Sequence, residues 1–216
     1  QVLTALEVAC ALAGHRHVEL AHVETALGTT PQRYGRDDHY DVVSAFIKTM
    51  RGSDPVAAIF WLARMLDAGE DASFIARRLI IFASEDIGLA DPGALQVAVA
   101  AAHALEHVGL PEAQLNLAEA ALYLARAPKS NRTALAIWNA RADVRDGAVG
   151  EVPAHLRDAH YHGAASLGHG DGYEYPHDHA AGTVDQQYLP DTLVGRRWYE
   201  PSVHGDEPTL GSTEAP

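Results

Sequence analysis

The sequence predicts an all-α protein, a helical bundle followed by an irregular C-terminal arm. Between Val2 and Arg145, apolar residues recur at helical spacing, and no stretch shows sustained alternation of apolar and polar residues or a β-branched run. After Asp146 the composition changes, because ten of the eighteen glycines and six of the eleven prolines fall in residues 147–216. Regular structure should therefore fill the first part of the chain and be sparse in the second.

Helix start and stop signals mark the joints of the predicted bundle. Asp54-Pro55 and Asp91-Pro92 each place a capping carboxylate before a proline whose fixed φ suits the first helical position. Gly69, Gly88 and Gly109 each follow an apolar segment, where a residue that tolerates positive φ ends a helix at little cost. With these signals, helices are expected near residues 2–13, 19–27, 38–51, 54–68, 72–87, 92–108, 112–126 and 132–145.

The helices and joints divide the chain into five segments. A joint at residues 29–36, which contains threonine, proline and glycine, separates a small leading piece, residues 1–28, from the main bundle, residues 37–146. Aromatic residues between 147 and 202 give the arm apolar anchors, so the arm is expected to pack over the bundle. Residues 203–216 are expected to be disordered.

Charge and composition disfavour several classes of protein. Sixteen basic against twenty-nine acidic residues give a formal net charge of -13, which opposes bulk binding to the phosphates of DNA. No apolar run approaches the roughly 20 residues that span a bilayer, so no membrane partner is expected. Residues 1–13 lack the basic leader of a signal peptide and Cys10 has no cysteine to pair with, so the expected location is the cytoplasm.

The predicted helix at residues 55–67 is apolar on nearly all sides, whereas an ordinary surface helix has one apolar stripe. Such a helix is either the centre of its own bundle or part of a contact with another subunit, and the sequence leaves both open. Apolar helices also follow at 72–87 and 92–108, and three of them are difficult to bury in one small bundle. If the second interpretation holds, the candidate interface residues are Ile59, Phe60, Trp61 and Met65.

Residues 126–132 gather cations beside the expected start of a helix, where free backbone N–H groups favour anions. The candidate residues for a contact with DNA or another anion are Arg126, Lys129, Ser130 and Arg132. The alternative is that Asn131 only caps the next helix, while the cations stay solvated or pair with carboxylates.

Catalytic and metal-binding signatures are missing from the sequence. The phosphate-binding pattern G-x-x-x-x-G-K-[ST] does not occur, and the only lysines are Lys48 and Lys129. The pair His103 and His107 lacks the acidic residue that the H-E-x-x-H signature places next to its first histidine. A metal-dependent hydrolase built on the tail is kept as a rival, although its candidate ligands match no zinc-site spacing: His169, Asp171, His177, Asp178 and His179.

Several strings of residues resemble one known protein family along nearly the whole chain. The strings are residues 39–48 (HYDVVSAFIK), 83–91 (ASEDIGLAD), 127–131 (APKSN), 168–173 (GHGDGY) and 187–190 (QYLP). They closely resemble the C-terminal half of the replication-associated recombination protein A family. That family comprises bacterial AAA+ ATPases related to the clamp loaders and to the Werner-helicase-interacting ATPases.

The resemblance implies that residues 1–28 are the end of the AAA+ lid and that the ATP site lies upstream. The chain would then be a non-catalytic fragment without a cofactor of its own, and ATP and Mg²⁺ would bind elsewhere in the parent protein. The resemblance also implies that residues 37–146 form a homotetramer through helices similar to a clamp-loader collar. The parent would act at stalled replication forks, with DNA and single-stranded-DNA-binding protein as partners.

Overall fold

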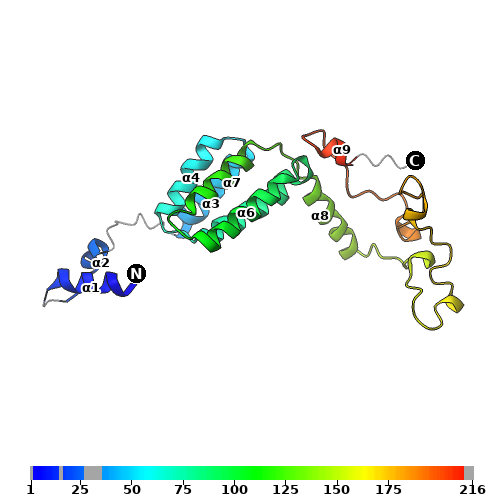
Figure 1. Cartoon of the computed structure of the whole chain (residues 1–216), viewed down its shortest axis with the longest axis horizontal. Coiled ribbons are helices and arrows are strands. Elements are labelled where there is room, and N and C mark those ends of the chain that lie inside the picture. Colours follow the sequence, from blue (N-terminus) through cyan, green and yellow to red (C-terminus); the bar gives the residue numbers. More distant parts are fainter. Residues whose placement is uncertain (1, 15–16, 27–35, 212–216) are drawn as a thin grey trace. The chain divides into compact units, whose positions relative to one another are not determined.

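The computed structural model describes residues 2–14, 17–26 and 36–211 (Figure 1). Within these ranges the regular structure is helical and no strand occurs, which confirms the all-α prediction. The linker expected at 29–36 lies outside the described residues up to residue 35. The α-helices are α1 (Val2–Ala13), α2 (Leu20–Ala26), α3 (Arg36–Arg51), α4 (Pro55–Asp67), α5 (Ala72–Phe82), α6 (Gly93–Val108), α7 (Gln114–Arg126), α8 (Arg132–Arg145) and α9 (Glu207–Gly211).

The expected helix at 72–87 differs from the structure, whereas the other expected helices end within two residues of the observed ones. After α5 ends at Phe82, the chain continues as a π-helix, η1 (Ala83–Ile87), and then as one 3₁₀ turn, η2 (Gly88–Ala90). A π-helix takes one more residue per hydrogen-bonded turn than an α-helix, and it is rare outside functional segments. The predicted cap of α4 is confirmed, because the Asp54 carboxylate accepts a hydrogen bond from the Ala57 N–H at 2.9 Å.

The chain divides into two compact units, which cut across the expected bundle. The first unit comprises Gln1–Ala83 and Gly93–Ala127, and the second comprises Ser84–Pro92 and Pro128–Pro216. The bundle expected at residues 37–146 is therefore divided, because α8 contacts η2 and belongs to the second unit. Among the described residues, no helix is long and apolar enough to cross a membrane.

Helix α7 is the central element of the first unit and packs against α3, α4, α5 and α6, while α1 and α2 pack against each other (Figure 1). The buried side of α7 is rich in alanine, which lets neighbouring helices approach closely. These residues are Leu117, Ala120, Ala121, Leu124 and Ala125. Larger side chains fill the core around them, among them Phe46, Met50, Met65, Leu79 and Phe82.

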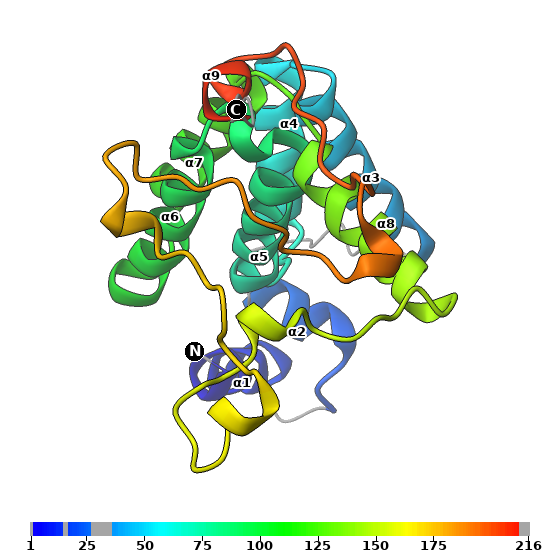
Figure 2. The ribbon, with the colours of Figure 1, turned by 90° about the vertical axis from the view of Figure 1, so that its right-hand side faces the viewer.

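The arm in the second unit is irregular, as the sequence predicts, and single helical turns interrupt its path (Figure 2). Hydrogen bonds from side chains fix it in place. Asp143 on α8 accepts one from the Trp198 indole N–H and one from the Arg196 guanidinium, both at 2.9 Å. The Thr192 hydroxyl donates to the Val149 carbonyl at 3.2 Å. Contacts between segments distant in sequence therefore replace the regular hydrogen bonds that the arm lacks.

Candidate functional site

The outward side of α4 carries exposed apolar residues. Val56 is 80% exposed and Phe60 is 59% exposed, whereas Ile59 and Trp61 are half-buried. The Phe60 and Trp61 rings meet edge to face with centroids 5.1 Å apart. Met65 is 1% exposed and belongs to the core of the first unit, so it cannot take part in a contact with a partner. Of the four candidate interface residues, Phe60 alone is fully on the surface.

A groove of about 250 Å³ lies between α4 and α7, and we call it, together with Val56, Phe60 and Leu115, the α4–α7 face. It is lined by Ile59, Leu62, Ala63, Leu66, Asp67, Gln114, Leu115 and Ala118. Helical periodicity places Ala63 and Asp67 in one row with Val56 and Phe60, so the exposed apolar residues border the groove. Leu115 is 69% exposed and lies off the buried stripe of α7, a signal that the sequence analysis missed.

The cation-rich segment 126–132 crosses the boundary between the two units. Arg126 is exposed at the end of α7 in the first unit, and the other candidate residues belong to the second. Asn131 occupies the N-cap position of α8, as the alternative interpretation expects, but its side chain makes no capping hydrogen bond. The Ser130 hydroxyl instead accepts a hydrogen bond from the Arg132 N–H at 3.3 Å. The Ser130 side chain, one residue earlier, thus satisfies one of the free N–H groups at the start of α8.

Lys129 and Ser130 are engaged within the second unit. Burial lowers the pKa of the Lys129 ammonium, and the neighbouring Asp86 carboxylate opposes that change. Ser130 is buried, and its N–H donates to the Asp86 carbonyl at 2.8 Å. Arg132 remains exposed. The structure therefore leaves Arg132, rather than the whole segment, open to solvent in this unit.

The Glu207 carboxylate is the most buried acidic group of the second unit, and it lies in the part of the tail that was expected to be disordered. It accepts hydrogen bonds from the hydroxyls of Tyr199 at 3.0 Å and Ser202 at 2.5 Å, and from the Ser130 side chain. Burial raises the pKa of Glu207, but these hydrogen bonds outweigh it and leave the pKa below its ordinary value. Burial and the nearby carboxylate raise the pKa of Tyr199.

These contacts hold residues 198–211, which we call the strap, against η2 and the start of α8. The Asp206 N–H donates to the Ala90 carbonyl at 2.9 Å. Gly205 has a φ of +55°, and a Cβ atom there would lie 2.0 Å from the Ala90 oxygen and 2.6 Å from Pro128. The structure therefore places the tail through residue 211 against η2, whereas the sequence predicts disorder from residue 203 because the contacts to Ala90 and Ser130 join segments distant in the chain. Residues 212–216 lie outside the described residues.

Acid should weaken the second unit through Glu207. Its pKa in the folded chain lies below the ordinary value of 4.5, so its contribution to the free energy of unfolding is complete above that value. The contribution disappears as the pH falls through the lower, folded pKa. Urea unfolding between about pH 7 and pH 3 should show a larger loss of stability in the wild-type chain than in Glu207→Gln. Equal losses would mean that other carboxylates carry the acid sensitivity.

The arm encloses a cavity of about 520 Å³ between residues 150–157 and 187–192. Its polar groups bond to the arm itself. Arg157 donates to the Val152 carbonyl at 2.7 Å and to the Glu151 carboxylate at 2.8 Å, and the His155 Nε2 lies 2.8 Å from the Gln187 carbonyl. These hydrogen bonds hold the arm's loops together.

The tail residues of the rival hydrolase hypothesis are not gathered. In the part of the chain that the structure describes, no three histidine, cysteine, aspartate or glutamate side chains lie close enough to hold one metal ion. The His169 ring nitrogen Nδ1 instead lies 2.7 Å from the Tyr161 hydroxyl, and His179 lies 3.6 Å from the Glu174 carboxylate. The geometry thus gives no support to a three-ligand catalytic metal site in the described arm.

Known proteins resemble this chain over most of its length. The family described as "MgsA AAA+ ATPase C terminal" matches residues 52–214. An uncharacterized AAA domain-containing protein of Mycobacterium tuberculosis is 56% identical over 211 residues, which are 96% of this chain and 47% of that protein.

Several relatives carry a functional name. Replication-associated recombination protein A of Bacillus subtilis is 48% identical over 194 residues, with 89% of this chain and 46% of that protein covered. The protein of the same name from Escherichia coli K12 is 43% identical over 176 residues, with 81% and 39% covered. The chain spans less than half the length of these relatives.

Proposed function

Because this chain belongs to the family of MgsA AAA+ ATPase C-terminal regions, we propose that it is the self-association region of an ATPase acting in DNA replication and recombination. The observation that carries the proposal is the α4–α7 face, where large apolar side chains border an apolar groove. Exposed apolar surface of this kind is costly in water unless a partner covers it. Aromatic residues that enter a partner's pocket commonly dominate the energy of such contacts.

The proposed partner on this face is a second copy of the chain. Phe60 and the groove lie on the same face, so the Phe60 ring of one copy enters the groove of the other and the reverse holds by symmetry. Burying one phenylalanine removes roughly 150 to 250 Å² from water. Pairs of such dimers then form the homotetramer, and this larger assembly resembles a clamp-loader collar.

The masses of matched variants test the self-association. The wild-type chain should have a solution mass above 23.1 kDa by light scattering coupled to size exclusion. Phe60→Asp and Leu115→Asp should each weaken association at least about a hundredfold, because a buried unpaired charge costs about 3 kcal/mol or more. Both variants should keep the helical circular dichroism of the wild type, since their side chains are exposed.

Ile137→Asp is the control, because it adds the same charge at an exposed apolar position on α8 outside this face. Its mass should equal that of the wild type. A wild-type mass of 23.1 kDa persisting at high micromolar concentration would contradict the proposal.

The activity of the parent protein is also a proposal. We infer that ATP and Mg²⁺ bind to the parent outside these 216 residues, since they contain no phosphate-binding loop sequence, and that this part is not itself catalytic. DNA and single-stranded-DNA-binding protein are the proposed partners of the parent, in the cytoplasm. A direct DNA contact through Lys129 and Arg132 has weaker support, because Lys129 is partly buried beside Asp86.

A further inference from the structure

Two histidines lie one turn apart on the exposed side of α6. The Nε2 atoms of His103 and His107 are 3.0 Å apart, with the ring centroids 4.4 Å apart and the ring planes at 86°. Both residues are exposed, and α6 is a regular α-helix over Gly93–Val108, so the four-residue spacing holds them on one face. Two imidazole nitrogens at this distance share one proton, or they share a cation that accepts both lone pairs.

The distance is short enough for both rings to bind one ion. With each nitrogen about 2.0 to 2.1 Å from one ion, two nitrogens lie about 2.9 Å apart at a right angle and about 3.4 Å apart at the tetrahedral angle. The observed 3.0 Å is close to the right-angle value. Among divalent first-row metal ions, a given site with nitrogen donors generally binds Cu²⁺ more tightly than Ni²⁺ or Zn²⁺.

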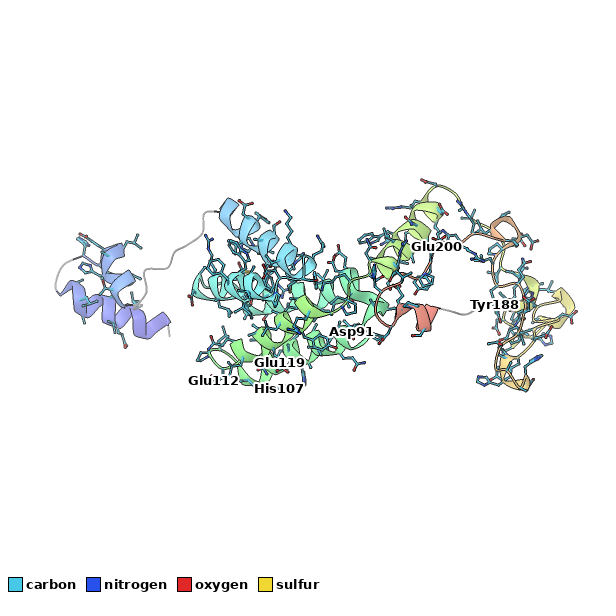
Figure 3. All side chains as sticks on the ribbon, turned by 90° about the horizontal axis from the view of Figure 1, so that it is seen from above. Asp91, His107, Glu112, Glu119, Tyr188 and Glu200 are labelled. Carbon is cyan, nitrogen blue, oxygen red and sulfur yellow. The ribbon has the colours of Figure 1, made fainter. Side chains whose placement is uncertain are left out.

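The surroundings of the pair attract cations. Residues 93–125, which run from the start of α6 almost to the end of α7, contain no lysine or arginine. The acidic residues in this stretch are Glu106, Glu112 and Glu119, and all three are exposed. In the view of Figure 3, the labelled residues Glu112 and Glu119 lie on the same side of the α6–α7 pair as His107. Exposed carboxylates lower the local potential and raise the concentration of cations beside the imidazoles.

We propose that His103 and His107 form a binding site for a divalent transition-metal ion, with Cu²⁺ bound more tightly than Ni²⁺ or Zn²⁺. The site is separate from the tail residues and from the α4–α7 face. In the described residues, the two imidazoles have no third histidine, cysteine or carboxylate ligand beside them, so water or a donor from another molecule completes the coordination. The site is therefore an open, two-ligand site rather than the three-ligand arrangement of a zinc hydrolase.

The test uses the untagged chain and Cu²⁺, Ni²⁺ and Zn²⁺ salts. Calorimetry should detect the binding of a Cu²⁺ ion that requires both histidines. Electron paramagnetic resonance should show two imidazole nitrogens bound to this ion. His103→Gln and His107→Gln should each weaken Cu²⁺ binding at least tenfold and remove the two-nitrogen signal. Both variants should keep the helical circular dichroism and solution mass of the wild type.

The matched control changes two exposed histidines of the arm. The double variant His177→Gln with His179→Gln should keep the wild-type Cu²⁺ affinity within about twofold. A two-nitrogen signal that survives in His103→Gln and His107→Gln would overturn the proposal. So would loss of the signal in the arm variant, or tighter binding of Zn²⁺ than of Cu²⁺.

Discussion

Glu207→Ala is expected to detach the strap and to lower the free energy of unfolding of the second unit by about 3 kcal/mol. The substitution removes the shared acceptor of the Tyr199, Ser202 and Ser130 hydroxyls. A buried polar group that loses its partner costs about 1 to 3 kcal/mol, and water entering the opened strap limits the sum. The change is measured by urea unfolding, together with amide hydrogen exchange of residues 199–207.

Two other variants test whether the buried carboxylate of Glu207 holds the strap. Glu207→Gln keeps one carbonyl acceptor, so its loss of stability should be smaller, about 1 to 2 kcal/mol. Glu200→Ala removes an exposed carboxylate of the same strap, labelled in Figure 3, and should change stability by less than about 0.5 kcal/mol. Equal effects of the Glu200 and Glu207 alanine variants would mean that the buried carboxylate does not hold the strap.

Gly205→Ala is expected to have an effect of similar size through the backbone rather than through charge. A methyl group at this position would lie 2.0 Å from the Ala90 oxygen, which is backbone and cannot swing away. The strap must therefore lift from η2, and the hydrogen bond from Asp206 to Ala90 is lost with it. Faster hydrogen exchange at Asp206 and a stability loss of about 3 kcal/mol should follow.

Gly195→Ala provides the matched comparison. Gly195 also has a positive φ, +82°, but nothing lies within 4 Å of a Cβ atom built there. Its substitution should cost only the conformational penalty of about 1 kcal/mol. If the two alanine variants lost the same stability, the close approach of the strap to Ala90 would be unimportant.

The order of the helices could be predicted because their ends carry local signals. Asp54 and Pro55 mark the start of α4 in sequence, and the structure has the expected cap. The rotation of α4 about its axis could not be predicted, since nearly every side of this helix is apolar. Its packing against α3 and α7 determines that Met65 is buried and that Phe60 is exposed. The sequence therefore predicts the helix but not which of its residues reach the surface.

The second unit was the less predictable part, because its contacts join segments without a shared periodicity. The sequence predicts that residues after 202 are disordered, yet Glu207 is completely buried. A lone glutamate in a polar tail carries no local sign of burial, because its partners Tyr199, Ser202 and Ser130 are polar as well. The start of α8 was equally hard to predict, because Ser130 and Asn131 are both good capping residues. In the structure the Ser130 side chain accepts a hydrogen bond from the Arg132 N–H, and the Asn131 side chain makes no capping bond.

The hydrogen bond between Asp206 and Ala90 joins positions more than a hundred residues apart. This contact therefore cannot form during synthesis until the strap has been made. The first unit is complete once residue 127 has left the ribosome, whereas the second needs the strap. Roughly eighty further residues are then translated, at about 5 to 20 residues per second. During this interval η2 and the start of α8 lack their contacts with the strap. A partly folded nascent segment is open to aggregation during this interval. The arm that is synthesised then is acidic and rich in glycine, a composition that favours solubility.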